Sequence, residues 1–292
     1  MSGFVDFARA HGVLINEAKF FASEHIKRCA TIEHPKSGNG AYFWDGERGW
    51  VFAWDGDARV QWWNDPNARP WTEEEKEAWR CKRDAARATQ EREYQRAAHR
   101  AAEMLRQAVP GRHDYLIRKK LPDAQGLVLP TGELIVPMRN PFTGDLQGVQ
   151  VIRWNGEAMR WEKKMTPGMR AKGAVLRLGP RTARETIFCE GYATGLSIEA
   201  AARQMRLSAA VMVCFSDSNM AHVAGLMNKG QRYVFADHDK SGAGERAAQA
   251  TGLPYCMSPT EGQDANDLHA SDGLLTVARL LMQVRQQEKA MT

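Results

Sequence analysis

The chain has 292 residues, of which 43% are hydrophobic and 26% are charged, a composition typical of a globular protein large enough for two domains. Its net charge of +5 favours a polyanionic partner without identifying one. No apolar run reaches the roughly 18 residues of a membrane span, and the first 25 residues lack the apolar core of a signal peptide. The five cysteines are scattered and contain no Cys-x-x-Cys pair, so we expect reduced thiols, a cytoplasmic location and no membrane association.

The first region, residues 1–70, is expected to be a small β-rich unit that is both aromatic and basic. Residues 1–23 have the apolar pattern of a helix, and residues 24–65 alternate short aromatic runs with turns. Asp45-Gly46 and Asp55-Gly56 predict hairpins between antiparallel strands. The aromatic side chains either form the core of this sheet or stack on single-stranded bases beside a basic groove, and the sequence leaves both roles open. They are Tyr42, Phe43, Trp44, Trp50, Phe52, Trp54, Trp62 and Trp63.

The same region holds the zinc candidates of the chain. His25, Cys29 and His34 follow one another at short spacings, and Asp45 is a weak fourth candidate. A structural zinc site usually takes four ligands, arranged as two knuckles rich in cysteine and histidine. With one cysteine available, we expect no zinc.

Residues 71–108 are predicted to form a long charged helix that links two domains. Thr72 with Glu75 matches a capping box, and no proline or glycine follows before residue 109. The next region, residues 109–183, is expected to be a basic mixed α+β subdomain. It contains a short helix at 113–121 and strands at 126–130, 133–140 and 148–154.

Residues 184–292 have the alternating pattern of an α/β domain. Four apolar strands are expected at 186–190, 209–215, 233–237 and 254–258, with helices between them and a last amphipathic helix near 272–288. This order predicts a mainly parallel sheet with flanking helices. Because ligands bind at the carboxyl ends of such strands, Glu190, Asp237 and Asp239 become candidate site residues.

The segment "FADHDKSGAGERAA" fits three kinds of site. A calcium loop that starts at Asp237 is excluded, because its twelfth position is Ala248 instead of glutamate. A dinucleotide-binding turn is disfavoured, because two carboxylates stand between the strand and the glycines and would repel a pyrophosphate. Residues two apart at a strand end point the same way, so Asp237 and Asp239 can converge on one divalent cation. Taken singly, each carboxylate could also be a solvated loop residue or a helix cap.

Three segments together, "FCEGYATGLSI", "FADHDKSGAGERAA" and "GQDANDLH", resemble a TOPRIM domain over residues 184–270. This fold is shared by DnaG-type primases, type IA and type II topoisomerases and some nucleases, and the last segment is similar to the "DAND" element of bacterial, phage and plasmid primases. The resemblance implies that Glu190 is the catalytic acid or base and that Asp237 and Asp239 hold Mg²⁺ or Mn²⁺. It also implies that Asp264 is a further ligand, with Asp267 as the alternative.

The basic region before it carries a second likeness to DnaG-type primases. "YLIRKK" is similar to their "YLxxRG" helix, with Lys119 at the basic position and Lys120 in place of the glycine. "EKKMTPGMRAKG" resembles a stretch that ends in Lys-Gly. The resemblance nominates five nucleotide or template contacts, with a solvated basic face as the alternative. These are Lys119, Lys120, Lys164, Arg170 and Lys172.

The resemblance implies a DNA primase of phage or plasmid type, which copies single-stranded DNA into short RNA primers from NTPs. No G-x-x-x-x-G-K-[ST] motif occurs, so a replicative helicase is expected as a separate partner. Two alternatives stay open: a metal-dependent TOPRIM nuclease, and a catalytically idle accessory or inhibitor protein that binds nucleic acid.

Overall fold

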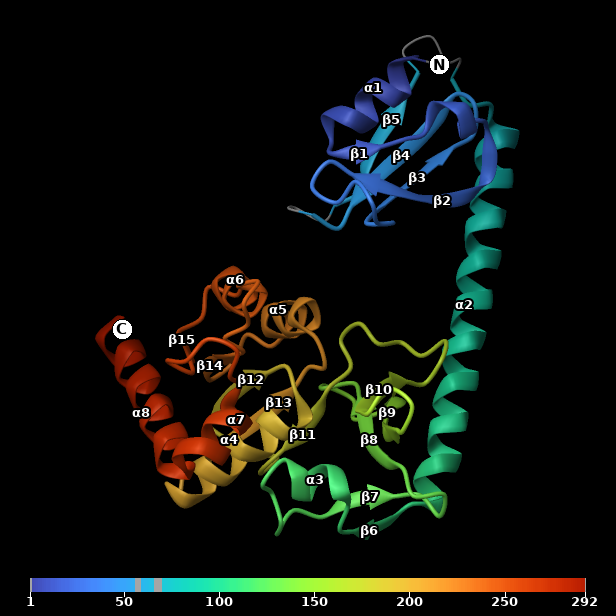
Figure 1. Cartoon of the computed structure of the whole chain (residues 1–292). Coiled ribbons are helices and arrows are strands. Elements are labelled where there is room, and N and C mark those ends of the chain that lie inside the picture. The colour runs from blue at the N-terminus through green and yellow to red at the C-terminus, as the bar shows by residue number, and fades with distance from the viewer. Residues whose placement is uncertain (1, 56–58, 66–69, 292) are drawn as a thin grey trace. The chain divides into compact units, whose positions relative to one another are not determined.

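The computed structural model describes residues 2–55, 59–65 and 70–291 (Figure 1). Its internal contacts divide the chain into two units, residues 1–83 and 84–292, and each is described by itself. The expected hairpin at Asp55-Gly56 lies partly outside the described residues. None of the helices in the described ranges is both long and apolar enough to cross a membrane.

The first unit is an antiparallel sheet in the order β1-β2-β3-β4-β5. The strands are β1 (Val13–Leu14), β2 (Ser23–Thr31), β3 (Gly40–Trp44), β4 (Arg48–Ala53) and β5 (Gln61–Asn64). The sequence predicted a helix over residues 1–23, but the observed helix, α1, covers only Ser2–Ala10, so the prediction is wrong for the rest of the segment. Gly12 follows with a φ of 78°, a left-handed conformation that ends the helix, and β1 and a short 3₁₀ turn at Glu17–Lys19 complete the segment.

The strand register sorts the aromatic residues of this sheet onto two faces. Tyr42 and Trp44 pack with Phe4 of α1 in a buried core. Phe43 is opposite Trp50, and Trp50 is opposite Trp62, so these three form a row on the other face. The two roles left open by the sequence thus divide by strand face: one set is core, and the other is available for contacts outside it.

Helix α2 (Glu73–Gln107) starts with the predicted capping box. The Glu75 amide donates to the Thr72 hydroxyl at 3.2 Å, and the Thr72 amide donates to the Glu75 carboxylate at 2.9 Å. Towards its end the helix is no longer solvated on all sides. Ala97 and Ala101 are fully buried in two apolar clusters that include residues of the next sheet, so the last turns of α2 belong to the second unit.

The second unit begins with an antiparallel sheet in the order β10-β9-β8-β7-β6. Its elements are β6 (Val109–Gly111), α3 (Asp114–Arg118), β7 (Gly126–Val128), β8 (Leu134–Arg139), β9 (Leu146–Asn155) and β10 (Arg160–Met165). Tyr115 and Leu116 of α3 are buried beside residues of α4, which joins this sheet to the one that follows.

The third sheet has the order β11-β13-β12-β14-β15, with β11 antiparallel and the other strands parallel. The strands are β11 (Leu176–Leu178), β12 (Glu185–Cys189), β13 (Ala209–Val213), β14 (Gln231–Ala236) and β15 (Tyr255–Met257). The helices are α4 (Tyr192–Gln204), α5 (Asp217–Leu226), α6 (Ala243–Ala250), α7 (Ala265–Asp272) and α8 (Leu274–Met291).

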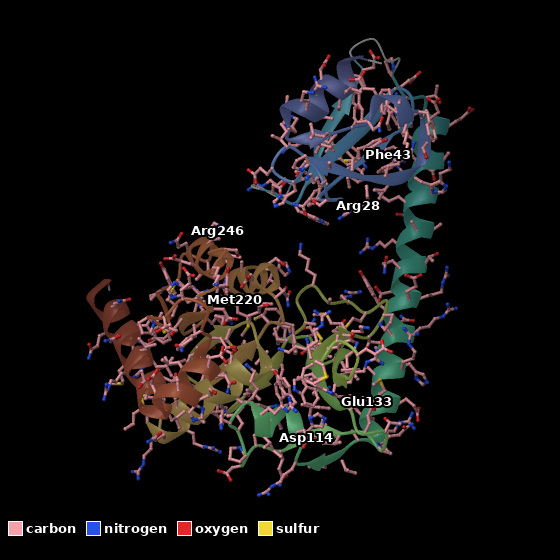
Figure 2. All side chains as sticks on the ribbon, viewed as in Figure 1. Arg28, Phe43, Asp114, Glu133, Met220 and Arg246 are labelled. Atoms are coloured by element: carbon pink, nitrogen blue, oxygen red, sulfur yellow. The ribbon has the colours of Figure 1, made fainter. Side chains whose placement is uncertain are left out.

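Two apolar clusters cover the two faces of this sheet. One gathers α4, α7 and α8, and the other gathers α5 and α6, with Met220 of α5 buried in it (Figure 2). The predicted α/β class, with a parallel sheet, flanking helices and preceding antiparallel sheets, is confirmed. The antiparallel edge strand β11 is an addition to that prediction.

Candidate metal-dependent active site

Three carboxylates follow three neighbouring parallel strands. Glu190 follows β12, Asp237 follows β14, and Asp217 begins α5 four residues after the end of β13. Since β12 lies between β13 and β14, and all three run in the same direction, their carboxyl ends share one edge of the sheet. The sheet therefore brings these side chains together, at the place where parallel α/β sheets bind ligands.

Glu190 and Asp217 act on each other directly. Their carboxyl groups are close enough for a proton on one to bridge to the other. Burial, together with the charges of Asp217 and Asp237, raises the pKa of Glu190 to about 8. Burial also raises the pKa of Asp217, while the hydrogen bond from Glu190 lowers it. At neutral pH, Glu190 therefore keeps a proton and donates it to the Asp217 carboxylate.

Asp237 is the most desolvated carboxylate of the group. Burial is the main cause that raises its pKa to about 7, and the charges of Asp264 and Asp217 add to it. Its Oδ1 atom and the Oδ1 atom of Asp217 are buried and have no hydrogen-bond partner among the described residues. A buried carboxylate oxygen without a partner is costly unless a cation or proton compensates it.

These orphaned oxygens fit a divalent cation. Mg²⁺, the cation that the sequence resemblance implies, prefers one or two carboxylates together with water and substrate phosphate. Within the described residues, no three carboxylates of this cluster have ligand atoms that all lie within 4.8 Å of one another. Side-chain rotation is therefore needed before one cation can touch three of them.

Asp239 has a different environment from Asp237. The Ser241 amide at 2.8 Å, the Ala243 amide at 3.3 Å and the Ser241 hydroxyl donate to its Oδ1, and the Gly244 amide donates to its Oδ2 at 2.8 Å. These hydrogen bonds, led by that of the Ser241 side chain, lower the pKa of Asp239 to about 2. Asp239 thus anchors the start of α6. Its negative charge also makes a small contribution to the raised pKa of Asp237.

The glycines of this segment serve the two carboxylates. Any side chain at position 244 would clash with the backbone carbonyl of Asp237, so only glycine lets α6 start this close to the strand end. Gly242 precedes the helix at a φ of 67°. The Gly-Ala-Gly sequence is therefore explained by close packing around Asp237 and Asp239, without a dinucleotide.

Asp264 and Asp267 form a capping box at the start of α7. The Asp267 amide donates to Asp264 at 2.8 Å, and the Thr194 hydroxyl donates to the other Asp264 oxygen at 3.0 Å. Asp267 forms an ion pair with Lys119, with 3.2 Å between Oδ1 and Nζ. Asp264 is close enough to raise the pKa of Asp237, but both of its oxygens already accept hydrogen bonds. Its role as a metal ligand stays a prediction.

The five basic residues nominated by the sequence lie in different surroundings. Lys119 pairs with Asp267, and Lys164 pairs with Glu162 at 3.1 Å. Lys120 has a φ of 57°, so this lysine adopts the left-handed conformation that favours the glycine of the similar motif. Among the described residues, none of these three lysines forms a hydrogen bond with the unpartnered Oδ1 atom of Asp237.

The other two nominated residues are further along the chain. Arg170 pairs with Glu91 of α2 and lies over the Tyr94 ring, at 4.6 Å from its centroid. Lys172 lies close enough to His222 to help lower the pKa of that imidazole, after the larger effect of burial. Their contacts with nucleotide or template remain predictions.

Lys163 is close enough to the carboxylates to act on them electrostatically. Its charge lowers the pKa values of both Glu190 and Asp237, against the larger effect of burial. Neighbouring residues of β10 point to opposite faces of the sheet, so Lys163 lies on the face opposite to Lys164 and Glu162.

The zinc candidates of the first unit do not form a common site. His34 accepts or donates a hydrogen bond at 2.9 Å with Asp55, and Glu33, His34 and Asp55 have ligand atoms within 4.8 Å of one another. His25 and Cys29 are not part of this group. Asp55 also bonds Thr31 and Asn39, so the group serves the loop around it.

With its geometry in place, residues 185–274 can be assigned to a family: they match the Toprim domain. These residues, which contain the C-terminal parallel sheet and its helices, therefore form a Toprim domain. It is the α/β domain in which Glu190, Asp237 and Asp239 were selected as candidate site residues.

Comparisons over the whole chain identify no family beyond this domain. A chain in the solved structure of bacteriophage T7 lagging-strand DNA polymerase, interacting with primase domains of two gp4 subunits bound to an RNA/DNA hybrid and dTTP, is 13% identical in sequence. The match has a TM-score of 0.39 and covers 59% of this chain and 84% of that chain. No curated protein matches at a significant level.

Proposed function

We propose that this protein is a Mg²⁺-dependent DNA primase that synthesises short RNA primers on single-stranded DNA from NTPs. The observation that carries the proposal is the Toprim carboxylate cluster with two orphaned buried oxygens, faced by Lys163 from the preceding antiparallel sheet. A cation-binding acidic site next to a basic surface is what templated phosphoryl transfer requires.

The carboxylates of the cluster have separate tasks in this proposal. Asp237 and Asp217 offer their unpartnered oxygens to the cation, and Asp239 holds the loop that carries Asp237. When bound, the cation would neutralise the triphosphate and lower the pKa of the primer 3′-hydroxyl. The charge of the cation would also lower the pKa of Glu190, which is about 8 without it, so that Glu190 would release its own proton to solvent and then accept the proton of that hydroxyl.

Basic side chains position the substrates in the same scheme. Lys163 holds the phosphates of the incoming nucleotide against the carboxylate cluster, since its charge already acts on Glu190 and Asp237. Lys119, Lys120, Lys164, Arg170 and Lys172 remain proposed contacts of template or nucleotide. A replicative helicase is the proposed protein partner.

One assay separates primase from its alternatives. Full-length protein is incubated with single-stranded DNA, Mg²⁺ or Mn²⁺ and labelled NTPs. We expect oligoribonucleotides whose sequence depends on the template. Shortened DNA instead would identify a nuclease, and bound but unchanged DNA would identify an accessory protein; either result rejects the primase proposal.

The two adjacent lysines of β10 give a prediction within this assay. Lys163→Ala should reduce synthesis by roughly tenfold or more, because one charge-assisted contact with a phosphate is lost. Lys164→Ala should have a clearly smaller effect, because its side chain faces Glu162. Initial rates at saturating template compare the two. An equal loss in both variants, or a larger loss in Lys164→Ala, would show that Lys163 is not the phosphate contact.

A further inference from the structure

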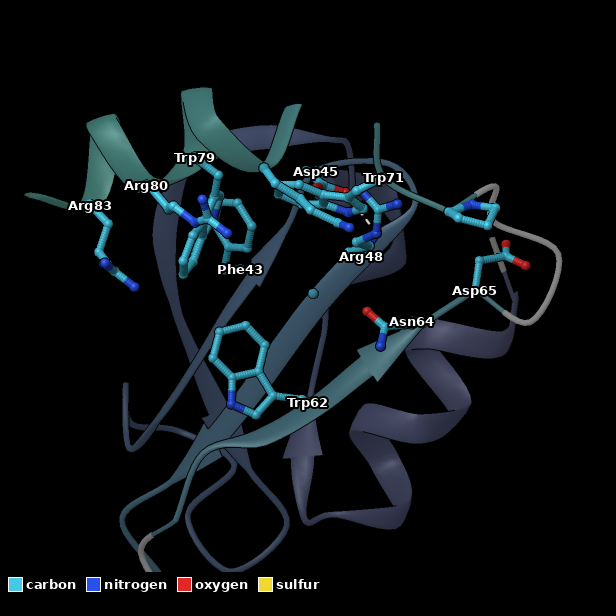
Figure 3. Close-up of a pocket in the computed structure, with 13 residues that line it drawn as sticks. Phe43, Asp45, Arg48, Trp62, Asn64, Asp65, Trp71, Trp79, Arg80 and Arg83 are labelled. Carbon is cyan, nitrogen blue, oxygen red and sulfur yellow. Dashed lines mark hydrogen bonds between the residues drawn. The ribbon is translucent and has the colours of Figure 1, made fainter. Parts of the chain in front are cut away.

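The first unit contains an aromatic cavity that the proposed chemistry does not use. The cavity has a volume of about 570 Å³ and lies between the sheet face that carries the Phe43–Trp50–Trp62 row and the first turns of α2 (Figure 3). Trp62 of β5 and Trp79 of α2 line it, together with Phe43 and Trp71. All of these residues belong to the unit formed by residues 1–83.

Two of these rings remain largely exposed to solvent. Trp62 is 65% exposed and Trp79 is 46% exposed, although both are large and apolar. Isolated exposed apolar residues are common, but here two indoles line one cavity beside two further rings. Trp71 and Trp79 meet edge to face with 6.2 Å between their centroids, so the aromatic rings of the cavity form one connected group.

The charges around the cavity favour an anionic ligand. Four basic side chains line it against two acidic ones, Asp45 and Asp65. The basic residues are Arg48, Lys76, Arg80 and Arg83. Asp45 is already engaged as the acceptor of the Glu47 and Arg48 amides at 2.9 and 2.6 Å. The net charge of the lining is therefore positive.

Some of the basic residues are held by contacts that a polyanion can replace. Lys76 pairs with Glu73 at 2.7 Å, and Arg80 pairs with Glu77 at 3.2 Å, both as exposed i,i+3 pairs on α2. Such exposed pairs are weak and screened by salt. Arg48 lies over Trp71, with 4.5 Å between guanidinium and ring centroid, and Arg83 lies over Trp79 at 5.5 Å. The cations and the rings thus form one surface.

We propose that this aromatic cavity binds single-stranded DNA, with bases stacked on Trp62 and Trp79 and phosphates held by the basic residues of α2. Stacked aromatic rings beside a cationic groove are the chemistry by which proteins bind unpaired bases without sequence preference. Bases in a duplex are already stacked on one another, so the surface selects single strands. The site does not depend on the Toprim carboxylates, and it would serve a primase or a binding protein alike.

The test measures binding of the full chain to a fluorescein-labelled thymidine oligonucleotide by fluorescence anisotropy, in EDTA and without nucleotide. Trp62→Ala and Trp79→Ala should each raise the Kd by roughly five- to hundredfold. Trp62→Phe and Trp79→Phe should restore most of the affinity, because a phenyl ring still stacks. Arg80→Ala should reduce the slope of log Kd against log salt by about 0.7 to 1.

A matched control lies in the same unit. Phe21 is 62% exposed and has the Lys27 Nζ atom 3.1 Å from its ring centroid, but it does not line the cavity. Phe21→Ala should leave the Kd unchanged, and thermal melts check that all variants fold. Unchanged affinity in Trp79→Ala, an equal loss in Phe21→Ala, or equal competition by duplex DNA overturns the proposal. Because EDTA is present, none of these results depends on whether the protein synthesises primers.

Discussion

Asp237→Asn is expected to abolish primer synthesis, by more than roughly a hundredfold, while it stabilises the metal-free protein. Loss of a residue that merely supports a metal ligand typically costs 10- to 100-fold in activity, so loss of a ligand itself should exceed that. The stabilisation follows from burial: the Asp237 carboxylate is desolvated beside Asp264 and Asp217, and the neutral amide is free of that repulsion. We expect a gain on the order of 1 kcal/mol in the free energy of unfolding at pH 8 without divalent cation.

Asp239→Asn is the matched variant, two residues away. Its carboxylate accepts hydrogen bonds from three amides and one hydroxyl at the start of α6, and an amide side chain cannot accept all of them. This variant should lose about 1 kcal/mol of stability, as expected when a helix cap is damaged. Urea unfolding in EDTA measures both signs. If the two variants shift stability in the same direction, the assignment of Asp237 as the unsupported ligand is wrong.

Stability without divalent cation should depend on Glu190 in a defined pH range. The folded-state pKa of about 8 lies above the ordinary glutamate value of about 4.5. Below pH 4.5 the residue is protonated in both states and costs nothing. Between about pH 4.5 and 8 the folded protein retains a proton that the unfolded chain has released, so stability is lost as the pH rises.

Glu190→Gln removes this loss. The variant should be about as stable as the wild type at pH 4.5 and more stable by on the order of 2 kcal/mol at pH 8, a discounted value because Asp217 shares the proton. Urea unfolding in EDTA at several pH values measures the difference. The same substitution at exposed Glu261 controls for the loss of one charge. A constant difference between wild type and Glu190→Gln across this range would show that Glu190 is not a desolvated acid.

The sheet that carries the site could be predicted from the sequence. Apolar runs that alternate with helices predict parallel strands, and the carboxylates at the ends of two of them, Glu190 and Asp237, follow directly. The order of the strands within the sheet could not be predicted from the sequence. That order places β13 beside β12, and it is what brings Asp217 into contact with Glu190.

Asp217 itself was missed by sequence reasoning. It stands in a Ser-Asp-Ser stretch at the start of a helix, where an acidic residue is typical of the first turn. The signal available was its position after a buried strand, the same signal that selected the other carboxylates. Lys163 was seen from the sequence as part of the basic cluster, but Lys164 was the one nominated as a contact. Alternation along β10 shows that the two lysines point to opposite faces, and the sequence alone does not say which face is nearer to the carboxylates.

The first unit was predictable as a small aromatic sheet, but not in detail. The composition could not separate core rings from exposed rings, because this depends on cross-strand register. The register places Tyr42 with Phe4 and Phe43 with Trp50 on the opposite face. The position of α2 against that second face depends on contacts that no local pattern encodes.

Mn²⁺ binding, followed by the loss of the free-ion electron paramagnetic resonance signal during titration, tests the central claim most directly, because it needs no template or substrate. The wild-type protein should bind Mn²⁺ and release it when Mg²⁺ is added. Asp237→Asn and Asp217→Asn should each weaken binding by roughly tenfold or more. Undiminished binding in both variants, or no binding by the wild-type protein, would contradict a cation held by these carboxylates.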